Sequence, residues 1–90
     1  MVVKKVTIIN KLGLHARAAA KLVALASKYS CKITIQRDDE EPINAKSIMA
    51  VMMLAAGRGT ELEITVEGDE ETIAMSKIKS LIEDRFGESE

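Results

Sequence analysis

The chain has 90 residues, of which 47% are hydrophobic and 30% are charged, and its formal net charge is −1 at pH 7. This length predicts a single domain over residues 1–90, large enough to bury a core without disulfides or a metal. With no tryptophan, one tyrosine and one phenylalanine, that core must be aliphatic. Nucleic-acid-binding domains typically carry a positive surface and stacking aromatic residues, so we expect no nucleic-acid partner.

The single cysteine and the N-terminal pattern exclude further classes. Cys31 cannot form an internal disulfide, and one cysteine with one histidine supplies too few ligands for a zinc site, so we expect no metal. We expect Cys31 to be a small buried residue at the start of a strand. The first residues lack the apolar segment of a signal peptide, and no apolar run reaches membrane-spanning length. The sequence therefore predicts a cytoplasmic protein without membrane insertion.

The first elements are a strand and a helix. Residues 2–9 are rich in β-branched side chains, which favours a strand, and residues 10–13 have the composition of a turn. From residue 16 to residue 28 the apolar spacing becomes helical. The face expected to be buried consists of Ala19, Leu22, Val23 and Ala26.

Two strands follow. Residues 31–36 alternate, with Ile33 and Ile35 on one side, and a charged turn leads to a short strand around Ile43. Pro42 cannot donate a main-chain hydrogen bond, so this short strand is expected at an edge of the sheet.

The next segment predicts a short helix and a fourth strand. Ser47 is the expected N-cap of a helix over residues 47–54, which we expect Gly57 to end. Residues 61–67 then alternate regularly between apolar and polar side chains. The side facing the core is expected to hold Leu62, Ile64 and Val66.

A final helix is predicted from residue 70 to about residue 85, and residues 87–90 are expected to fray. Its buried stripe is expected to comprise Ala74, Met75, Ile78, Leu81 and Ile82. The order of elements is βαββαβα. Strands that are apolar on one side only favour an antiparallel sheet with the helices on a single face, an α+β fold.

His15, the only histidine, stands where the first helix pattern begins. A lone histidine is most often a surface or capping residue, but its neighbours favour a function. Gly13 permits a tight chain approach, the unpaired main-chain N–H groups of Ala16 and Arg17 attract anions, and Arg17 adds a planar donor. Imidazole is a nucleophile that can accept and release a phosphoryl group. We predict that His15 is phosphorylated and that Arg17 holds the phosphate, although Arg17 could equally bind a partner's carboxylate.

The helix at residues 47–54 is apolar on more than one face. Val51 and Leu54 can face the core. On another face we expect three apolar side chains to be partly exposed and to form a docking patch for partners, namely Ile48, Met49 and Met52. The alternative is a helix that is buried on two sides.

Ser47 has a structural and a regulatory interpretation. The simpler one is an N-cap and nothing more. A phosphate at this helix start would be tolerated, however, and its charge would lie beside the apolar side chains that a partner needs. Ser47 is therefore also a candidate regulatory site.

Other functions remain to be compared with a phosphoryl carrier. No second general acid or base accompanies His15 in its motif and no cofactor motif is present, so we expect neither a free-standing enzyme nor a cofactor. A second hypothesis is an interaction module, in which the methionine patch binds a target and phosphorylation of His15 changes the affinity.

Two motifs give the sequence its resemblance to a known family. The stretches Gly13-Leu14-His15-Ala16-Arg17 and Asn44-Ala45-Lys46-Ser47-Ile48-Met49, at this separation and in this order of elements, resemble HPr, the histidine-containing phosphocarrier family of the bacterial phosphotransferase system. The resemblance implies an open-faced β-sandwich, in which three helices cover one face of a four-stranded antiparallel sheet.

The resemblance also implies roles and partners. In the family, the histidine that corresponds to His15 accepts a phosphoryl group on Nδ1 from enzyme I and passes it to a IIA protein or domain. The arginine that corresponds to Arg17 holds the phosphate. In many members the serine that corresponds to Ser47 is modified by an HPr kinase/phosphorylase. The residues that correspond to Ile48, Met49 and Met52 dock partners. We expect a monomer.

One position departs from the family pattern. The family motif usually continues with proline after the arginine, whereas this chain has Ala18. Proline in a first helical turn pre-sets φ, so alanine predicts a looser turn with the chemistry retained. The sequence leaves open whether the chain serves sugar transport or the nitrogen-related branch of the system.

Overall fold

The regularly alternating strand β4 (Glu61–Glu67) lies at the centre of the sheet. In the computed structural model, which describes residues 1–90, β4 pairs antiparallel with β1 (Val2–Thr7) on one side and β2 (Lys32–Arg37) on the other. The two-residue strand β3 (Ile43–Asn44) pairs with β2, which gives the order β1-β4-β2-β3. The predicted inward side chains of β4 are all buried, namely Leu62, Ile64 and Val66.

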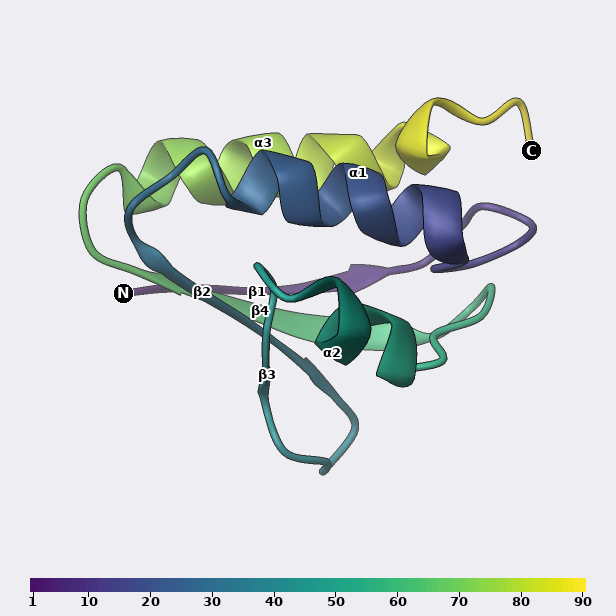
Figure 1. Ribbon diagram of the computed structural model, residues 1–90, viewed down its shortest axis with the longest axis horizontal. Coiled ribbons are helices and arrows are strands. Elements are labelled where there is room, and N and C mark those ends of the chain that lie inside the picture. Colours follow the sequence, from purple (N-terminus) through teal and green to yellow (C-terminus); the bar gives the residue numbers. More distant parts are fainter.

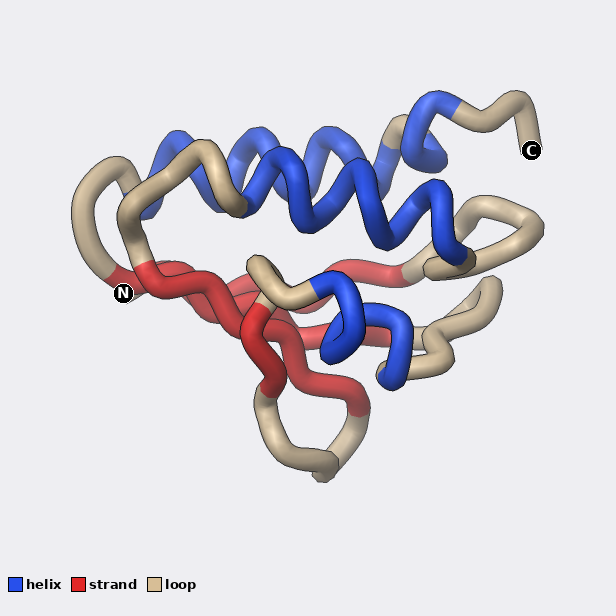
Figure 2. Tube along the Cα trace, viewed as in Figure 1, coloured by secondary structure: helices blue, strands red, loops and turns tan.

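The helices cover the apolar face of this sheet. Helix α1 (Ala16–Ala26) lies beside α3 (Glu71–Glu83) above the sheet, and α2 (Ile48–Met53) lies next to α1 (Figure 1). Figure 2 shows the two long helices above the layer of strands, while the short helix α2 overlaps the strands in this view. The predicted α+β fold, an open-faced sandwich of a four-stranded antiparallel sheet and three helices, is confirmed. None of these helices is long and apolar enough to cross a membrane.

Several element boundaries differ from the predictions. Strand β1 ends at Thr7, and Cys31 is buried as expected but precedes β2. Helix α2 is followed not by a left-handed Gly57 but by Ala55, whose φ is +51°. A tertiary contact stabilises this ending, because the Arg37 guanidinium donates to the main-chain oxygens of the C-cap Leu54 (2.7 Å) and of the left-handed Ala55 (3.0 Å).

The expectation that residues 87–90 fray is wrong. After α3 the chain forms a short left-handed turn, η1 (Arg85–Gly87), with φ near +55° at both Arg85 and Phe86. Two left-handed non-glycine residues together cost about 2–4 kcal/mol, and the complete burial of the Phe86 side chain offsets much of this cost. Lys21 Nζ also donates to the Phe86 main-chain oxygen (2.6 Å). The turn directs residues 88–90 back toward the start of α1.

Candidate functional site

The loop before α1 is fixed by a close contact at Gly13. Its φ is +69°, and a Cβ at this position would lie 2.5 Å from the main-chain oxygen of Ala56 and 2.7 Å from the Cα of Gly57. The Leu14 N–H donates to the same Ala56 oxygen at 2.8 Å. The loop that follows α2 therefore sets the position at which α1 begins.

His15 is the N-cap of α1. Its main chain is extended (φ −73°, ψ 178°), and its side-chain Nδ1 accepts a hydrogen bond from the Arg17 N–H at 3.3 Å. The Ala16 N–H makes no hydrogen bond. Nδ1 thus lies at the positive end of the helix, where main-chain N–H groups favour an anion.

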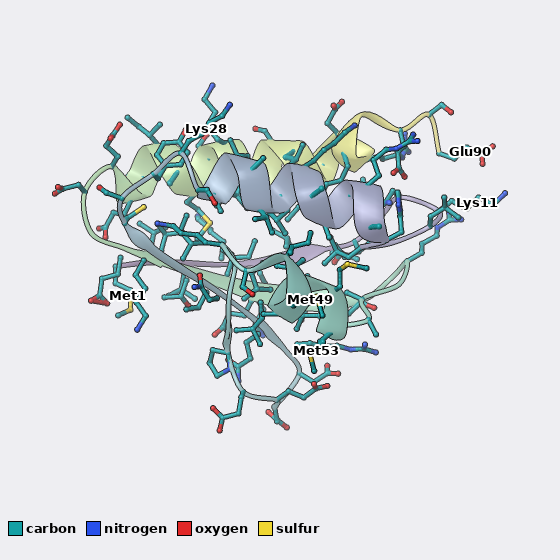
Figure 3. All side chains as sticks on the ribbon, viewed as in Figure 1. Met1, Lys11, Lys28, Met49, Met53 and Glu90 are labelled. Carbon is teal, nitrogen blue, oxygen red and sulfur yellow. The ribbon has the colours of Figure 1, made fainter.

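The predicted phosphate-binding residues lie together. His15, Ala16 and Arg17 line an open pocket of about 580 Å³. The Arg17 side chain is exposed, and its guanidinium forms neither an ion pair nor a hydrogen bond. Lys11 and Glu90 lie near one another at the edge of this pocket (Figure 3), where Lys11 Nζ is 3.4 Å from a Glu90 carboxylate oxygen. The pocket is open to solvent, and its lining combines these cationic groups with the acidic side chains of Glu88 and Glu90.

Two site residues were missed by sequence reasoning, Glu88 and Asn10. The Glu88 carboxylate contacts Nε2 of His15 through one oxygen and accepts from Asn10 Nδ2 (3.0 Å) through the other. Asn10 is completely buried and also donates to the Gly13 main-chain oxygen at 2.8 Å. These hydrogen bonds, first from Asn10 and then from His15, hold the pKa of Glu88 below its usual value, against the opposing effect of desolvation.

The second predicted surface lies on α2. Val51 and Leu54 face the core, whereas Ile48, Met49 and Met52 are between 37% and 68% exposed, so the predicted division of the helix is confirmed. We call the exposed apolar residues of this helix the α2 patch; it consists of Ile48, Met49, Met52 and Met53. Met53, the most exposed of them, was not assigned to the patch from the sequence. Figure 3 shows Met49 and Met53 along the outer side of α2.

Ser47 caps α2 as predicted. Its Oγ accepts from the Ala50 N–H at 3.3 Å, and the residue is half-buried. It does not line the pocket at His15. It precedes Ile48 directly, so a charge on its hydroxyl would lie beside the α2 patch.

Comparison with known proteins decides the family. A family model described as "PTS HPr component phosphorylation site" matches residues 2–84. The chain belongs to the HPr family. It is 54% identical over 86 residues to the phosphocarrier protein HPr of Pseudomonas aeruginosa, a match that covers 96% of each chain. As a member of this family it is a phosphocarrier of the phosphotransferase system.

Solved HPr structures have the same architecture. The crystal structure of HPr-C-His from Thermoanaerobacter tengcongensis superimposes with a TM-score of 0.94 at 42% identity, covering 100% of both chains. A crystal structure of an HPr dimer from the same organism matches with a TM-score of 0.77 at 44% identity, covering 92% of this chain and 94% of that one.

Proposed function

We propose that His15 carries the phosphoryl group, which it accepts from enzyme I and donates to a IIA protein or domain. The observation that carries this proposal is the position of Nδ1, which accepts the Arg17 N–H and therefore holds a lone pair at the helix start. The neighbouring free Ala16 N–H and the unpaired Arg17 guanidinium are donors for phosphate oxygens. The same residues are the ones that matched the family motif.

The chemistry of the step is a direct transfer. The Nδ1 lone pair gives up its hydrogen bond from the Arg17 N–H and forms a bond to phosphorus, while the bond from phosphorus to the donor's leaving atom breaks and takes its electron pair to the donor. The released Arg17 N–H can then donate to a phosphoryl oxygen. Charge develops on the phosphoryl oxygens, which the Arg17 guanidinium and the N–H groups at the start of α1 stabilise. Donation to a IIA acceptor is the same step with the roles reversed.

The first experiment is incubation with enzyme I and labelled phosphoenolpyruvate. We expect one acid-labile, base-stable label per chain, absent in His15→Ala. Arg17→Ala should slow labelling about tenfold or more, as expected for the loss of a charged hydrogen bond, while Arg58→Ala, which removes an exposed arginine outside this pocket, should not. A His15→Ala protein that still relays phosphate to a IIA acceptor would disprove the assignment.

The α2 patch is proposed as the docking surface for enzyme I and IIA proteins. It lies on the helix next to α1, and its methionines can adapt to more than one partner surface. Replacing Met49 and Met52 with aspartate should weaken binding to both partners. Ile73→Asp is the matched control, because Ile73 is a similarly exposed apolar residue on α3. Equal effects of the two changes would contradict docking at the patch.

Ser47 is proposed as a regulatory site for an HPr kinase/phosphorylase. A phosphate there would add negative charge next to Ile48 and disfavour apolar docking. Ser47→Asp should slow transfer from enzyme I relative to Ser47→Ala, and equal rates for the two variants would leave the serine with its capping role alone.

We also propose that the carrier acts as a monomer and a single domain. Three of the similar solved structures are described as dimers, so the oligomeric state of this chain has to be measured in solution. We expect sedimentation in the analytical ultracentrifuge to give the mass of a monomer. The interaction-module hypothesis is supported by the exposed α2 patch. It predicts a target outside the relay that binds equally well to His15→Ala.

A further inference from the structure

The two ring nitrogens of His15 have different partners, and both contacts require the same protonation state. Nδ1 accepts from the Arg17 N–H, so it carries a lone pair rather than a proton. Nε2 contacts a carboxylate oxygen of Glu88, which can only accept, so Nε2 carries the proton. The neutral ring is thereby held in the tautomer whose nucleophilic nitrogen faces the helix start.

We propose that Glu88 is a positioning residue for phosphoryl transfer, which it assists through the Nε2–H of His15. The proposal rests on the proposed role of His15 as the phosphoryl carrier. A carboxylate that accepts from one ring nitrogen fixes the tautomer and the ring orientation, and it favours the ring when positive charge develops on it.

The change in the charge of the His15 ring during transfer explains how Glu88 assists the reaction. When the Nδ1 lone pair forms the bond to phosphorus, the ring keeps its Nε2 proton and becomes formally cationic, while the donor leaves with the electron pair of the broken bond. The Glu88 carboxylate then faces a cationic ring instead of a neutral one, so its hydrogen bond strengthens during the transfer. In the donation step, the ring returns to the neutral Nε2–H form and no proton has to move.

Glu88 can serve this purpose because its carboxylate is held in place. One oxygen accepts from the completely buried Asn10, and the side chain as a whole is only 18% exposed. The preceding turn is anchored by buried Phe86 and by the bond from Lys21 to the Phe86 oxygen. The contact is therefore part of the packed structure and not a chance meeting of two surface side chains.

The Glu88 carboxylate contacts the ring nitrogen that does not receive the phosphoryl group. Glu88 contacts the ring at Nε2, whereas the Arg17 main-chain N–H donates to the other ring nitrogen, Nδ1. In the alternative role, the negative charge of Glu88 repels the phosphoryl group of the donor and so inhibits the transfer. Positioning predicts that removing the carboxylate slows transfer, and repulsion predicts that removing it accelerates transfer.

The test compares Glu88→Ala and Glu88→Gln with Glu83→Ala in the full chain. Glu83 is the control, because it is an exposed carboxylate at the end of α3 that does not line the pocket at His15. Two quantities are measured: the single-turnover rate of phosphorylation by phosphorylated enzyme I, and the ¹⁵N–¹H signal of the His15 Nε2–H in the unphosphorylated protein near neutral pH.

We expect Glu88→Ala to lower the rate about tenfold, the loss expected for one hydrogen bond to a charged group, and to broaden or abolish the Nε2–H signal through exchange with water. Glu88→Gln keeps an oxygen acceptor without the charge, so it should give an intermediate rate. Glu83→Ala should leave both quantities unchanged. Amide spectra away from the site check that each variant is folded.

A rate for Glu88→Ala that equals or exceeds the wild-type rate, or an unchanged Nε2–H signal, would overturn the proposal. A failure of the proposed function of His15 gives a different result from a failure of the Glu88 proposal. In that case the wild-type protein takes no label from active enzyme I, while the ring signal still reports whether Glu88 holds His15.

Discussion

The close approach of the main chain at Gly13 means that adding a Cβ there should destabilise the fold, and the structure gives the magnitude of the loss. In Gly13→Ala, the new Cβ would lie 2.5 Å from the Ala56 main-chain oxygen, a distance that forces one of the two loops to move. A left-handed alanine costs about 1–2 kcal/mol, and forcing an extra carbon into packed main chain costs about 1–3 kcal/mol. We therefore expect Gly13→Ala to lower the free energy of unfolding by about 2–5 kcal/mol.

Two other glycines separate these contributions. Gly59 also has a positive φ, +89°, but a Cβ there would meet nothing within 4 Å, so Gly59→Ala should lose only the conformational part, about 1–2 kcal/mol. Gly57 has neither a positive φ nor a neighbour within 4 Å, so Gly57→Ala should be neutral or stabilising by about 0.4–1 kcal/mol. The expected order of destabilisation is Gly13, then Gly59, then Gly57.

Urea and thermal unfolding of the three variants provide the assay. For a domain of this size, about 2 kcal/mol corresponds to a fall in Tm of at least about 8 °C. Equal losses in Gly13→Ala and Gly59→Ala would refute the claim that main-chain contact at Ala56 fixes the loop. A second measurement is the labelling rate of His15, which should fall in Gly13→Ala and stay unchanged in the other two variants.

Three further predictions concern the turn after α3, Glu88 and the cap of α2. Phe86→Ala should lower the free energy of unfolding by about 3–5 kcal/mol and speed amide exchange in residues 85–90, and a loss below about 1 kcal/mol would contradict its role as an anchor. Because the folded-state pKa of Glu88 is lowered, its stabilising effect is complete above the ordinary value of 4.5 and is lost as pH falls through the folded-state pKa. The wild type should therefore have a higher urea midpoint than Glu88→Gln at about pH 6, and this difference should disappear in acid. A difference in midpoint that does not depend on pH would be inconsistent with this linkage. Ser47→Ala should cost about 1 kcal/mol, since the Ala50 N–H loses its acceptor, and Ser47→Asn should restore most of that loss in the same unfolding assay.

The fold and the α2 patch were predictable because they follow from local spacing. Alternation in β4 identified its buried side, and the three-residue separation of Val51 and Leu54 identified the core face of α2. Both patterns record which side of an element meets water, and that information is present in a single stretch of sequence.

The missed features depend on contacts between distant parts of the chain. Residues 87–90 are polar and include a glycine, so local composition predicted fraying, whereas the Asn10 and His15 contacts hold Glu88. The left-handed conformations of Ala55 and Phe86 were equally invisible, because alanine and phenylalanine carry no local preference for them. In each case tertiary contacts override local propensity.

The central position of β4 has a consequence for how the protein is made. Strands β1 and β2 have no pairing with each other and both depend on β4, so a growing chain on the ribosome cannot assemble its sheet until residues 61–67 have emerged. The contact of His15 with Glu88 spans 73 positions and needs a still longer chain. Before β4 is made, β1 has no strand partner and β2 can pair only with the two-residue β3, so most of their apolar side chains stay exposed. A chaperone is most useful during this period. A chain cut short in translation would present the histidine motif without the surroundings that make it a site.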